Sequence, residues 1–155
     1  MANAEFTSFL CRFLDGPFTG STDALYGAVT RLLPLLDESA ECPTIAHFNN
    51  LLSDSGIVQY AATIDDNGVV VGLATVAVLP LASGLRATIE DVVVDSDYRG
   101  NGIGRALVEH CVELAREAGC ISIHLTSAPF REEANRLYQR LGFSLLTTNP
   151  YGLAL

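Results

Sequence analysis

Three glycines within five residues are the feature of the sequence with the clearest capacity for chemistry. They lie in the segment Tyr98-Arg99-Gly100-Asn101-Gly102-Ile103-Gly104-Arg105, between a β-branched run and a helical pattern. Glycines let a backbone approach a ligand closely, and the first N–H groups of a helix lack partners and carry the positive end of its dipole. The segment therefore predicts a site for a diphosphate, with charge-assisted hydrogen bonds from Arg99 and Arg105. The alternative is a tight glycine turn between two solvated arginines.

Two common phosphate-binding patterns do not match this loop. A dinucleotide fingerprint needs its glycines directly after a strand and an acidic residue about 20 positions later, at the end of the next strand. Here Asp95 to Arg99 intervene, and the next strand ends at His124-Leu125-Thr126. A Walker loop needs Gly-Lys followed by Ser or Thr, and the sequence contains no lysine.

Composition and charge narrow the class of protein. The chain has 155 residues, 49% of them apolar, and a formal net charge of −9, so we expect a single domain over residues 1–155 with a full core. The acidic balance argues against nucleic-acid partners and against anionic membrane surfaces, which both attract basic faces. It is compatible with a small amine substrate.

The four cysteines are expected to be free thiols. Cys11, Cys42, Cys111 and Cys120 form no CxxC pair, and no histidine stands at zinc-binding spacing from them, so no metal is expected. No charged and apolar leader opens the chain, and no apolar run approaches the roughly 20 residues of a membrane span. These features predict a reduced, cytoplasmic protein.

The elements that position the glycine loop are predicted from hydrophobic periodicity. The first part of the chain predicts a strand at 5–14, a helix from Ser21 or Thr22 to about Asp37, and a short helix from Pro43-Thr44 to Ser55-Gly56. A hairpin is predicted next, with strands at 57–64 and 69–79 joined by a turn at Asn67-Gly68. A loop at 80–84 and a strand at 86–94 follow. Pro34 should kink or shorten the first helix. Successive β-rich runs predict antiparallel pairing.

The second half alternates helix and strand. It predicts a helix over 101–118 ended by Gly119, a strand at 120–126, a helix over 131–141 ended by Gly142, and two short strands in 143–155 broken by Asn149-Pro150. Strand, helix, strand in that order implies a parallel crossover. The predicted fold class is α/β, a mixed, mostly antiparallel central sheet with helices on both faces.

The glycine segment resembles the acetyl-CoA motif of the GNAT N-acetyltransferase superfamily, Arg/Gln-x-x-Gly-x-Gly/Ala, with Arg99, Gly102 and Gly104 in the matching places. A second family motif is matched by Glu133-Ala134-Asn135-Arg136-Leu137-Tyr138-Gln139-Arg140-Leu141-Gly142-Phe143. The stretch from Ile89 to Gly100 is similar to the glucosamine-6-phosphate N-acetyltransferase branch. The resemblance covers about residues 57–155 and implies the GNAT fold and an acetyl-CoA-dependent N-acetyltransferase.

The resemblance also implies which residues bind the acetyl-CoA co-substrate. The strand should lend backbone groups to the pantetheine arm, and the glycine loop should hold the pyrophosphate. Asn135 should hydrogen-bond the pantetheine side, unless it is an exposed helix residue, and Arg140 should reach the adenosine end. The implied binding residues are Val92, Val93, Val94, Arg99, Gly100, Asn101, Gly102, Ile103, Gly104, Arg105, Asn135 and Arg140.

Two side chains are the candidate catalytic residues. The resemblance implies that Tyr138 lies near the thioester sulfur and protonates the leaving thiolate; the alternative is core packing on a helical face shared with Leu137 and Leu141. Glu90 stands in a β-branched strand and could act as a base, act through a water, or attract the substrate's ammonium group. The alternative for Glu90 is a salt bridge with Arg86.

The implied reaction is direct attack of a primary amine on the thioester in a ternary complex, with a backbone N–H near Val92 stabilising the oxyanion. A small-molecule amine is the expected acceptor, because the loop Thr126 to Arg131 resembles small bacterial GNAT members. Glucosamine-6-phosphate is the named alternative, with Arg12, Arg86 and Arg131 available for its phosphate. A protein acceptor and a non-catalytic acyl-CoA-binding domain also stay open. The apolar C-terminal tail is compatible with a homodimer.

Overall fold

The computed structural model describes residues 22–37, 39, 41–53, 57–63 and 69–154. Its elements are α2 (Thr22–Leu36), α3 (Ile45–Ser53), β1 (Ile57–Thr63), β2 (Val70–Leu81), β3 (Gly84–Val94), the 3-10 helix η1 (Ser96–Tyr98), α4 (Ile103–Glu117), β4 (Ser122–Leu125) and α5 (Glu132–Arg140). The predicted strand at 5–14 and the Asn67-Gly68 turn lie outside the described residues. Within those ranges, no helix combines the length and apolar character needed to cross a membrane.

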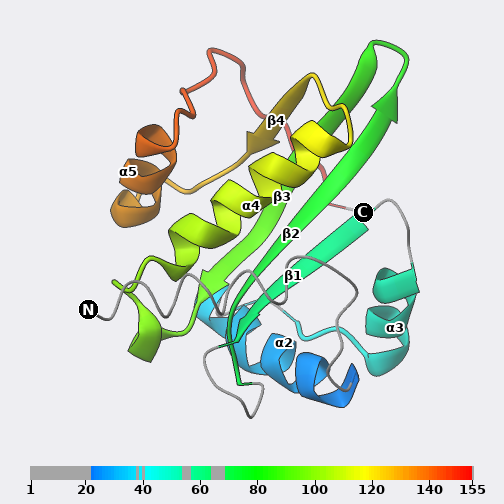
Figure 1. Cartoon of the computed structure of the whole chain (residues 1–155), viewed down its shortest axis with the longest axis vertical. Helices are drawn as coiled ribbons and strands as arrows, with labels where there is room; N and C mark the ends of the chain where they lie inside the picture. The colour runs from blue at the N-terminus through cyan, green and yellow to red at the C-terminus, as the bar shows by residue number, and fades with distance from the viewer. Residues whose placement is uncertain (1–21, 38, 40, 54–56, 64–68, 155) are drawn as a thin grey trace.

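The four described strands form one sheet in the order β1-β2-β3-β4 (Figure 1). β1 pairs with β2 and β2 with β3 in antiparallel fashion, whereas β3 and β4 are parallel. The parallel pair is joined through α4, as a crossover requires. The predicted mixed, mostly antiparallel sheet is confirmed.

Helices cover both faces of the sheet, and each face has its own core (Figure 1). On one face, α4 buries an apolar stripe against β2 and β3, with Leu107, Val108 and Cys111 fully enclosed. On the other face, α2 and Phe48 of α3 pack against Val70, Leu73 and Val93. The two faces follow from strand alternation, since neighbouring residues of a strand point to opposite sides.

Pro34 lies in the last turn of α2, which ends two residues later. A proline cannot donate a hydrogen bond to the carbonyl four residues earlier. In this case that carbonyl is Thr30 O, and the Cys42 thiol donates to it at 3.6 Å. The helix therefore continues through Pro34 and ends at Leu36, next to the predicted end at about Asp37, without a marked shortening.

The predicted loop at 80–84 is wrong. β2 continues through Pro80 to Leu81, which pairs with Gly84, so the turn contains only Ala82 and Ser83. β1 ends opposite Ala77. Among the described residues, β1 supplies no partner for Pro80, and a residue without an N–H can remain in a strand at such a position.

The two strands predicted in the C-terminal tail are also wrong. Residues 143–154 form neither helix nor strand, and Leu145, Leu146, Tyr151 and Leu153 are exposed. An extended segment becomes a stable strand when its backbone groups pair with a neighbour, and no described strand pairs with this one. The apolar pattern of the tail is therefore not a sign of burial.

Candidate active site

The glycine loop leads directly into the N-terminus of α4. Gly100 and Gly102 have positive φ angles of 79° and 80°, and Gly102 is the N-cap residue of α4. The first helical hydrogen bond runs from Ala106 N to Gly102 O at 3.0 Å. The N–H groups of Ile103, Gly104 and Arg105 therefore have no helical partner. The predicted anion site is geometrically feasible at this position.

Side chains of the loop hold its shape. The Asn101 side-chain amide donates to Tyr98 O at 3.1 Å and to Arg99 O at 3.4 Å. Its side-chain amide is thus used within the loop, and Asn101 does not line the pocket, so its predicted role in binding the cofactor remains a prediction. Asp95 accepts from Asp97 N at 3.2 Å and pairs with Arg31 of α2. No sequence pattern predicted this ion pair between α2 and the loop.

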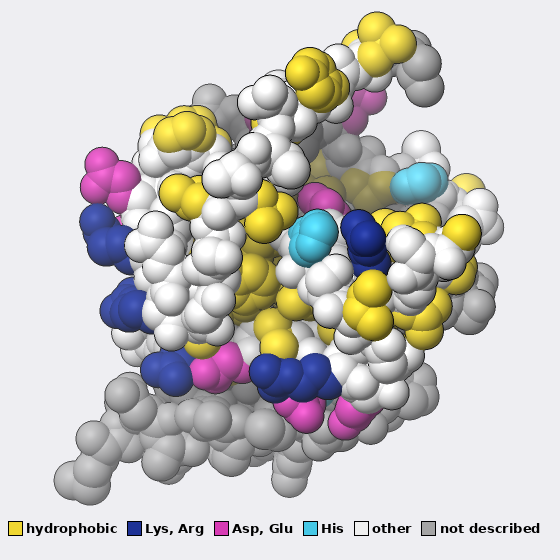
Figure 2. Space-filling model, turned by 90° about the horizontal axis from the view of Figure 1, so that it is seen from above, with side chains coloured by type: hydrophobic (Ala, Val, Ile, Leu, Met, Phe, Trp, Pro, Cys, Tyr) yellow, Lys and Arg dark blue, Asp and Glu magenta, His cyan; other side chains and the backbone are white. Residues whose placement is uncertain are grey.

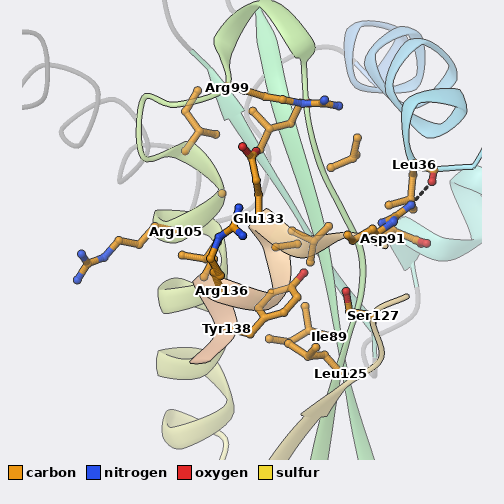
Figure 3. Close-up of a pocket in the computed structure, with 18 of the residues that line it drawn as sticks. Leu36, Ile89, Asp91, Arg99, Arg105, Leu125, Ser127, Glu133, Arg136 and Tyr138 are labelled. Atoms are coloured by element: carbon orange, nitrogen blue, oxygen red, sulfur yellow. Dashed lines mark hydrogen bonds between the residues drawn. The ribbon is translucent and has the colours of Figure 1, made fainter. Parts of the chain in front are cut away.

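The predicted phosphate-binding arginines differ in orientation. Arg99 donates from Nε to Val94 O at 3.3 Å, and its guanidinium extends across the pocket (Figure 3). Arg105 pairs with Glu109 at 2.9 Å and points away from the pocket (Figure 3). Arg140 is exposed and donates to Arg136 O at 3.3 Å. The side chain of Arg99 is therefore better placed for a pocket ligand than that of Arg105.

A β-bulge interrupts the sheet next to the loop. Thr75 pairs with Glu90 and Leu73 with Val93, so Asp91 and Val92 together oppose Ala74. Asp91 has a φ of 52°, the only positive value among the described non-glycine residues. The pairing of β3 with β4 ends just before the bulge, at Ile89 and Leu125. The two strands part there, and their backbone groups become free for a ligand.

One large pocket of about 1880 Å³ contains these features. Its walls come from residues 89–94 of β3, the glycine loop and the start of α4, residues 125–128, α5, and residues 34–37 at the end of α2. Figure 2 shows a hollowed face with hydrophobic side chains at the floor and arginine and acidic side chains around the rim. Such a pocket can take a long ligand with a charged end.

The two acidic residues at the bulge lie on the pocket wall. Glu90 is exposed and accepts a hydrogen bond from Thr88 Oγ1 at 2.8 Å. None of the ion pairs among the described residues joins Glu90 to Arg86. Burial raises the pKa of Asp91, and the neighbouring Glu90 charge raises it further. This wall would attract an ammonium group.

Tyr138 projects into the same pocket from α5 (Figure 3). Its ring packs edge-on against Phe143, with 6.1 Å between the centroids. Burial raises the pKa of Tyr138, and the Arg131 charge opposes that effect. Because its pKa is raised, Tyr138 is protonated at neutral pH. Its hydroxyl has no hydrogen-bond partner in the described part of the chain and is therefore able to donate to a ligand.

Asn135 is engaged within the protein. Its side-chain amide donates to Ala128 O at 3.0 Å and to Pro129 O at 3.4 Å, which fixes the loop before α5. It does not line the pocket. Its predicted contact with pantetheine therefore has no geometric support from the pocket lining and remains a prediction.

Ser127 was missed as a candidate, and Arg131 was expected only as a possible ligand for an acceptor phosphate. The Ser127 hydroxyl is buried without a hydrogen-bond partner among the described residues, and Ser127 lies beside Leu125 at the pocket (Figure 3). Arg131 donates a hydrogen bond to the carbonyl oxygen of Leu36, which is the last residue of α2. The contact of Arg131 with Leu36 could not be predicted from local spacing, because it joins segments 95 residues apart.

The buried thiol of Cys111 is poorly suited to act as a nucleophile. Cys111 is fully buried, and burial raises the pKa of its thiol to about 12. Its thiolate, the nucleophilic form, is therefore scarce at neutral pH. Within the described ranges no group of three or more His, Cys, Asp or Glu side chains could hold a metal ion.

Comparison with known proteins identifies the class. The profile of the acetyltransferase (GNAT) family matches residues 25–143. This chain belongs to that family, and it is an acetyltransferase with the GNAT fold.

Relatives in the family differ in the substrates that their names state. The chain is 35% identical over 119 residues to glucosamine 6-phosphate N-acetyltransferase of Trypanosoma brucei brucei, covering 72% of this chain and 79% of that protein. It is 41% identical over 59 residues to streptothricin acetyltransferase of Streptomyces lavendulae, covering 38% of this chain and 31% of that protein.

Solved structures agree on the fold. A Trypanosoma brucei acetyltransferase superposes with a TM-score of 0.71 at 29% identity, covering 86% of this chain and 94% of that one. A putative acetyltransferase from Agrobacterium tumefaciens superposes with a TM-score of 0.73 at 27% identity, covering 87% and 95%.

Proposed function

We propose that this protein transfers an acetyl group from acetyl-CoA to the primary amine of a small molecule by direct attack in a ternary complex. The observation that carries the proposal is that one pocket contains both an anion-binding end and an acidic wall. This pocket joins the unpaired N–H groups of the α4 N-terminus to the Glu90–Asp91 wall and to the Tyr138 hydroxyl. An anion-binding end and an amine-attracting end within one pocket suit a phosphate-bearing acyl donor and an amine acceptor.

The residues present fit acetyl-CoA, the co-substrate that GNAT acetyltransferases use. The α4 N-terminus and Arg99 would bind its pyrophosphate. After the bulge β3 still pairs with β2 but no longer with β4, and its backbone groups on the β4 side would bind the pantetheine arm. When bound, it supplies an acetyl group activated as a thioester. The N–H of Val92, at the bulge, would stabilise negative charge on the acyl oxygen.

Glu90 and Tyr138 would divide the proton transfers. Glu90 is exposed on the pocket wall and can take a proton from the ammonium group, directly or through a water. Tyr138 keeps its proton at neutral pH because burial raises its pKa. It can therefore donate a hydrogen bond or a proton to the leaving sulfur.

Glucosamine-6-phosphate is the second candidate acceptor, favoured by the 35% identity to an enzyme named for it. A phosphate on the acceptor would need a free cation near Glu90. Arg131 is bound to Leu36 O, Arg86 does not line the pocket, and Arg12 lies outside the described residues. Because the described arginines include none reserved for a phosphate, we propose an acceptor without a phosphate first.

The test is acetyl transfer from acetyl-CoA to a panel of amines, with products identified by mass spectrometry. The panel contains glucosamine-6-phosphate, polyamines, amino acids, aminoalkylphosphonates and short peptides. A Glu90→Gln variant should lose most transfer, and Glu113→Gln, which removes an exposed carboxylate on α4, should lose none. Product only from peptides, or no product although acetyl-CoA binds, would overturn the proposal.

A further inference from the structure

The Arg131 side chain joins the start of α5 to the end of α2, two segments 95 residues apart in the sequence. Its guanidinium donates to the carbonyl of Leu36, the last residue of α2. The last carbonyls of a helix lack partners and form the negative end of its dipole, so a cation is favourable there. Hydrogen bonds from Ser39 lower the pKa of Asp37, and the Arg131 charge adds to this effect.

This contact forms part of the pocket wall. Residues 34–37 and Arg131 both line the pocket. In Figure 3 the dashed line from Leu36 marks the bond, Asp91 lies beside it, and Tyr138 lies between this side and Arg105. The contact is therefore on the acceptor side of the pocket, away from the α4 N-terminus.

α5 is attached by half-buried contacts: Tyr138 and the C-cap residue Leu141 pack against the core cluster beside α4, and Asn135 bonds to the preceding loop. None of its residues is fully buried, and Arg131 at its N-cap makes no side-chain capping bond to the helix. Tyr138 follows Arg131 by seven residues, or two helical turns, so the two side chains share one face. Their proximity also shows in electrostatics, since the Arg131 charge acts against the burial of Tyr138.

We propose that Arg131 is a positioning residue for acetyl transfer: it holds the start of α5 against the end of α2, orients Tyr138 and closes the acceptor side of the pocket. The inference rests on the proposed function, in which Tyr138 acts on the leaving sulfur. It also gives Arg131 a role other than binding a substrate phosphate.

The test compares Arg131→Gln with Arg131→Lys, which keeps a cationic donor. In Arg131→Gln the acceptor KM should rise and kcat should fall, each by about threefold to tenfold, because a charge-assisted hydrogen bond is lost. The Kd for acetyl-CoA should stay within about twofold. Arg131→Lys should recover much of both losses, and Arg116→Gln, an exposed arginine on α4, should match the wild type.

Hydrogen exchange supplies a readout that needs no activity. Backbone amides of 132–140 should exchange faster in Arg131→Gln than in the wild type, whereas those of α4 should not change. Unchanged exchange in α5, or a loss of acetyl-CoA affinity as large as the rise in acceptor KM, would overturn the inference. A Lys variant as defective as the Gln variant would also overturn it. If no amine is acetylated, the proposed function fails, and the exchange result still decides whether Arg131 holds α5.

Discussion

Asp91 combines an unusual backbone conformation with a carboxyl group whose pKa is raised. It has a positive φ at the bulge, and burial and Glu90 raise its pKa above 3.8. As pH rises through the window between 3.8 and the raised value, the unfolded chain releases a proton that the native protein retains. Stability contributed by this residue therefore falls across that window.

Asp91→Asn should consequently raise the free energy of unfolding at neutral pH. Asparagine also accepts a positive φ, so the bulge should persist. The measurement is urea denaturation at neutral pH and at a pH below 3.8, where the gain should vanish. Asp23→Asn, at an exposed position in the first turn of α2, is the control and should bring no gain. An equal gain at both pH values would contradict this account.

At the residue scale, the sequence predicted the side chains that belong to motifs and missed those that act through distant contacts. Gly102 and Tyr138 stand in local patterns, and the structure brings both to one pocket. The pairs Arg31–Asp95 and Arg131–Leu36 join segments 64 and 95 residues apart. No local spacing encodes such pairs, because the fold as a whole brings them together.

At the element scale, the glycines at the two ends of α4 form a matched pair. Substituting each of them distinguishes the cost of backbone strain from an effect on ligand binding. Gly102 at its start and Gly119 just after its end both have positive φ, at 80° and 78°, and a Cβ at either would meet nothing within 4 Å. Alanine at each should cost about 1 kcal/mol of stability through backbone strain. The two costs should be similar.

Only Gly102→Ala should weaken acetyl-CoA binding, by about threefold to tenfold, since it disturbs the N–H groups proposed to hold the pyrophosphate. Isothermal titration calorimetry gives the affinity, and thermal unfolding gives the stability. Equal losses of affinity in the two variants would show that the α4 N-terminus is not the binding site.

Elements with strong periodicity and clear end signals were predictable. The helices ended by Gly119 and Gly142 are confirmed, as are the hairpin strands and the parallel crossover. The bulge at Asp91 was not predicted, because a β-branched run looks the same with or without an extra residue. The tail strands failed because a strand depends on a neighbour, which its own residues do not reveal.

At the scale of the whole molecule, two hydrophobic cores pack against opposite faces of the sheet. Gly72 of β2 lies under α4, where a Cβ would stand 3.0 Å from both Ile103 Cγ2 and Leu107 Cδ1. Both of those side chains are buried, so neither can move away freely. The close approach sets the distance between α4 and the sheet, and therefore the position of the helix N-terminus.

Gly72→Ala should destabilise the protein by about 1–3 kcal/mol through overpacking. Gly27→Ala is the control, because a Cβ there meets nothing within 4 Å on α2. It should stabilise by about 0.5–1 kcal/mol, since alanine favours a helix over glycine. Chemical denaturation of both variants measures the difference. Similar changes of the same sign would contradict the packing account.

The central claim is that Tyr138 assists the transfer of an acetyl group within this pocket. Its most direct test is the acetylation rate of Tyr138→Phe, with an accepted amine from the panel, beside Tyr151→Phe in the exposed tail. We predict a loss of about 10²-fold for Tyr138→Phe, with acetyl-CoA affinity retained, and no loss for Tyr151→Phe. A folded Tyr138→Phe variant with the wild-type rate would contradict the claim.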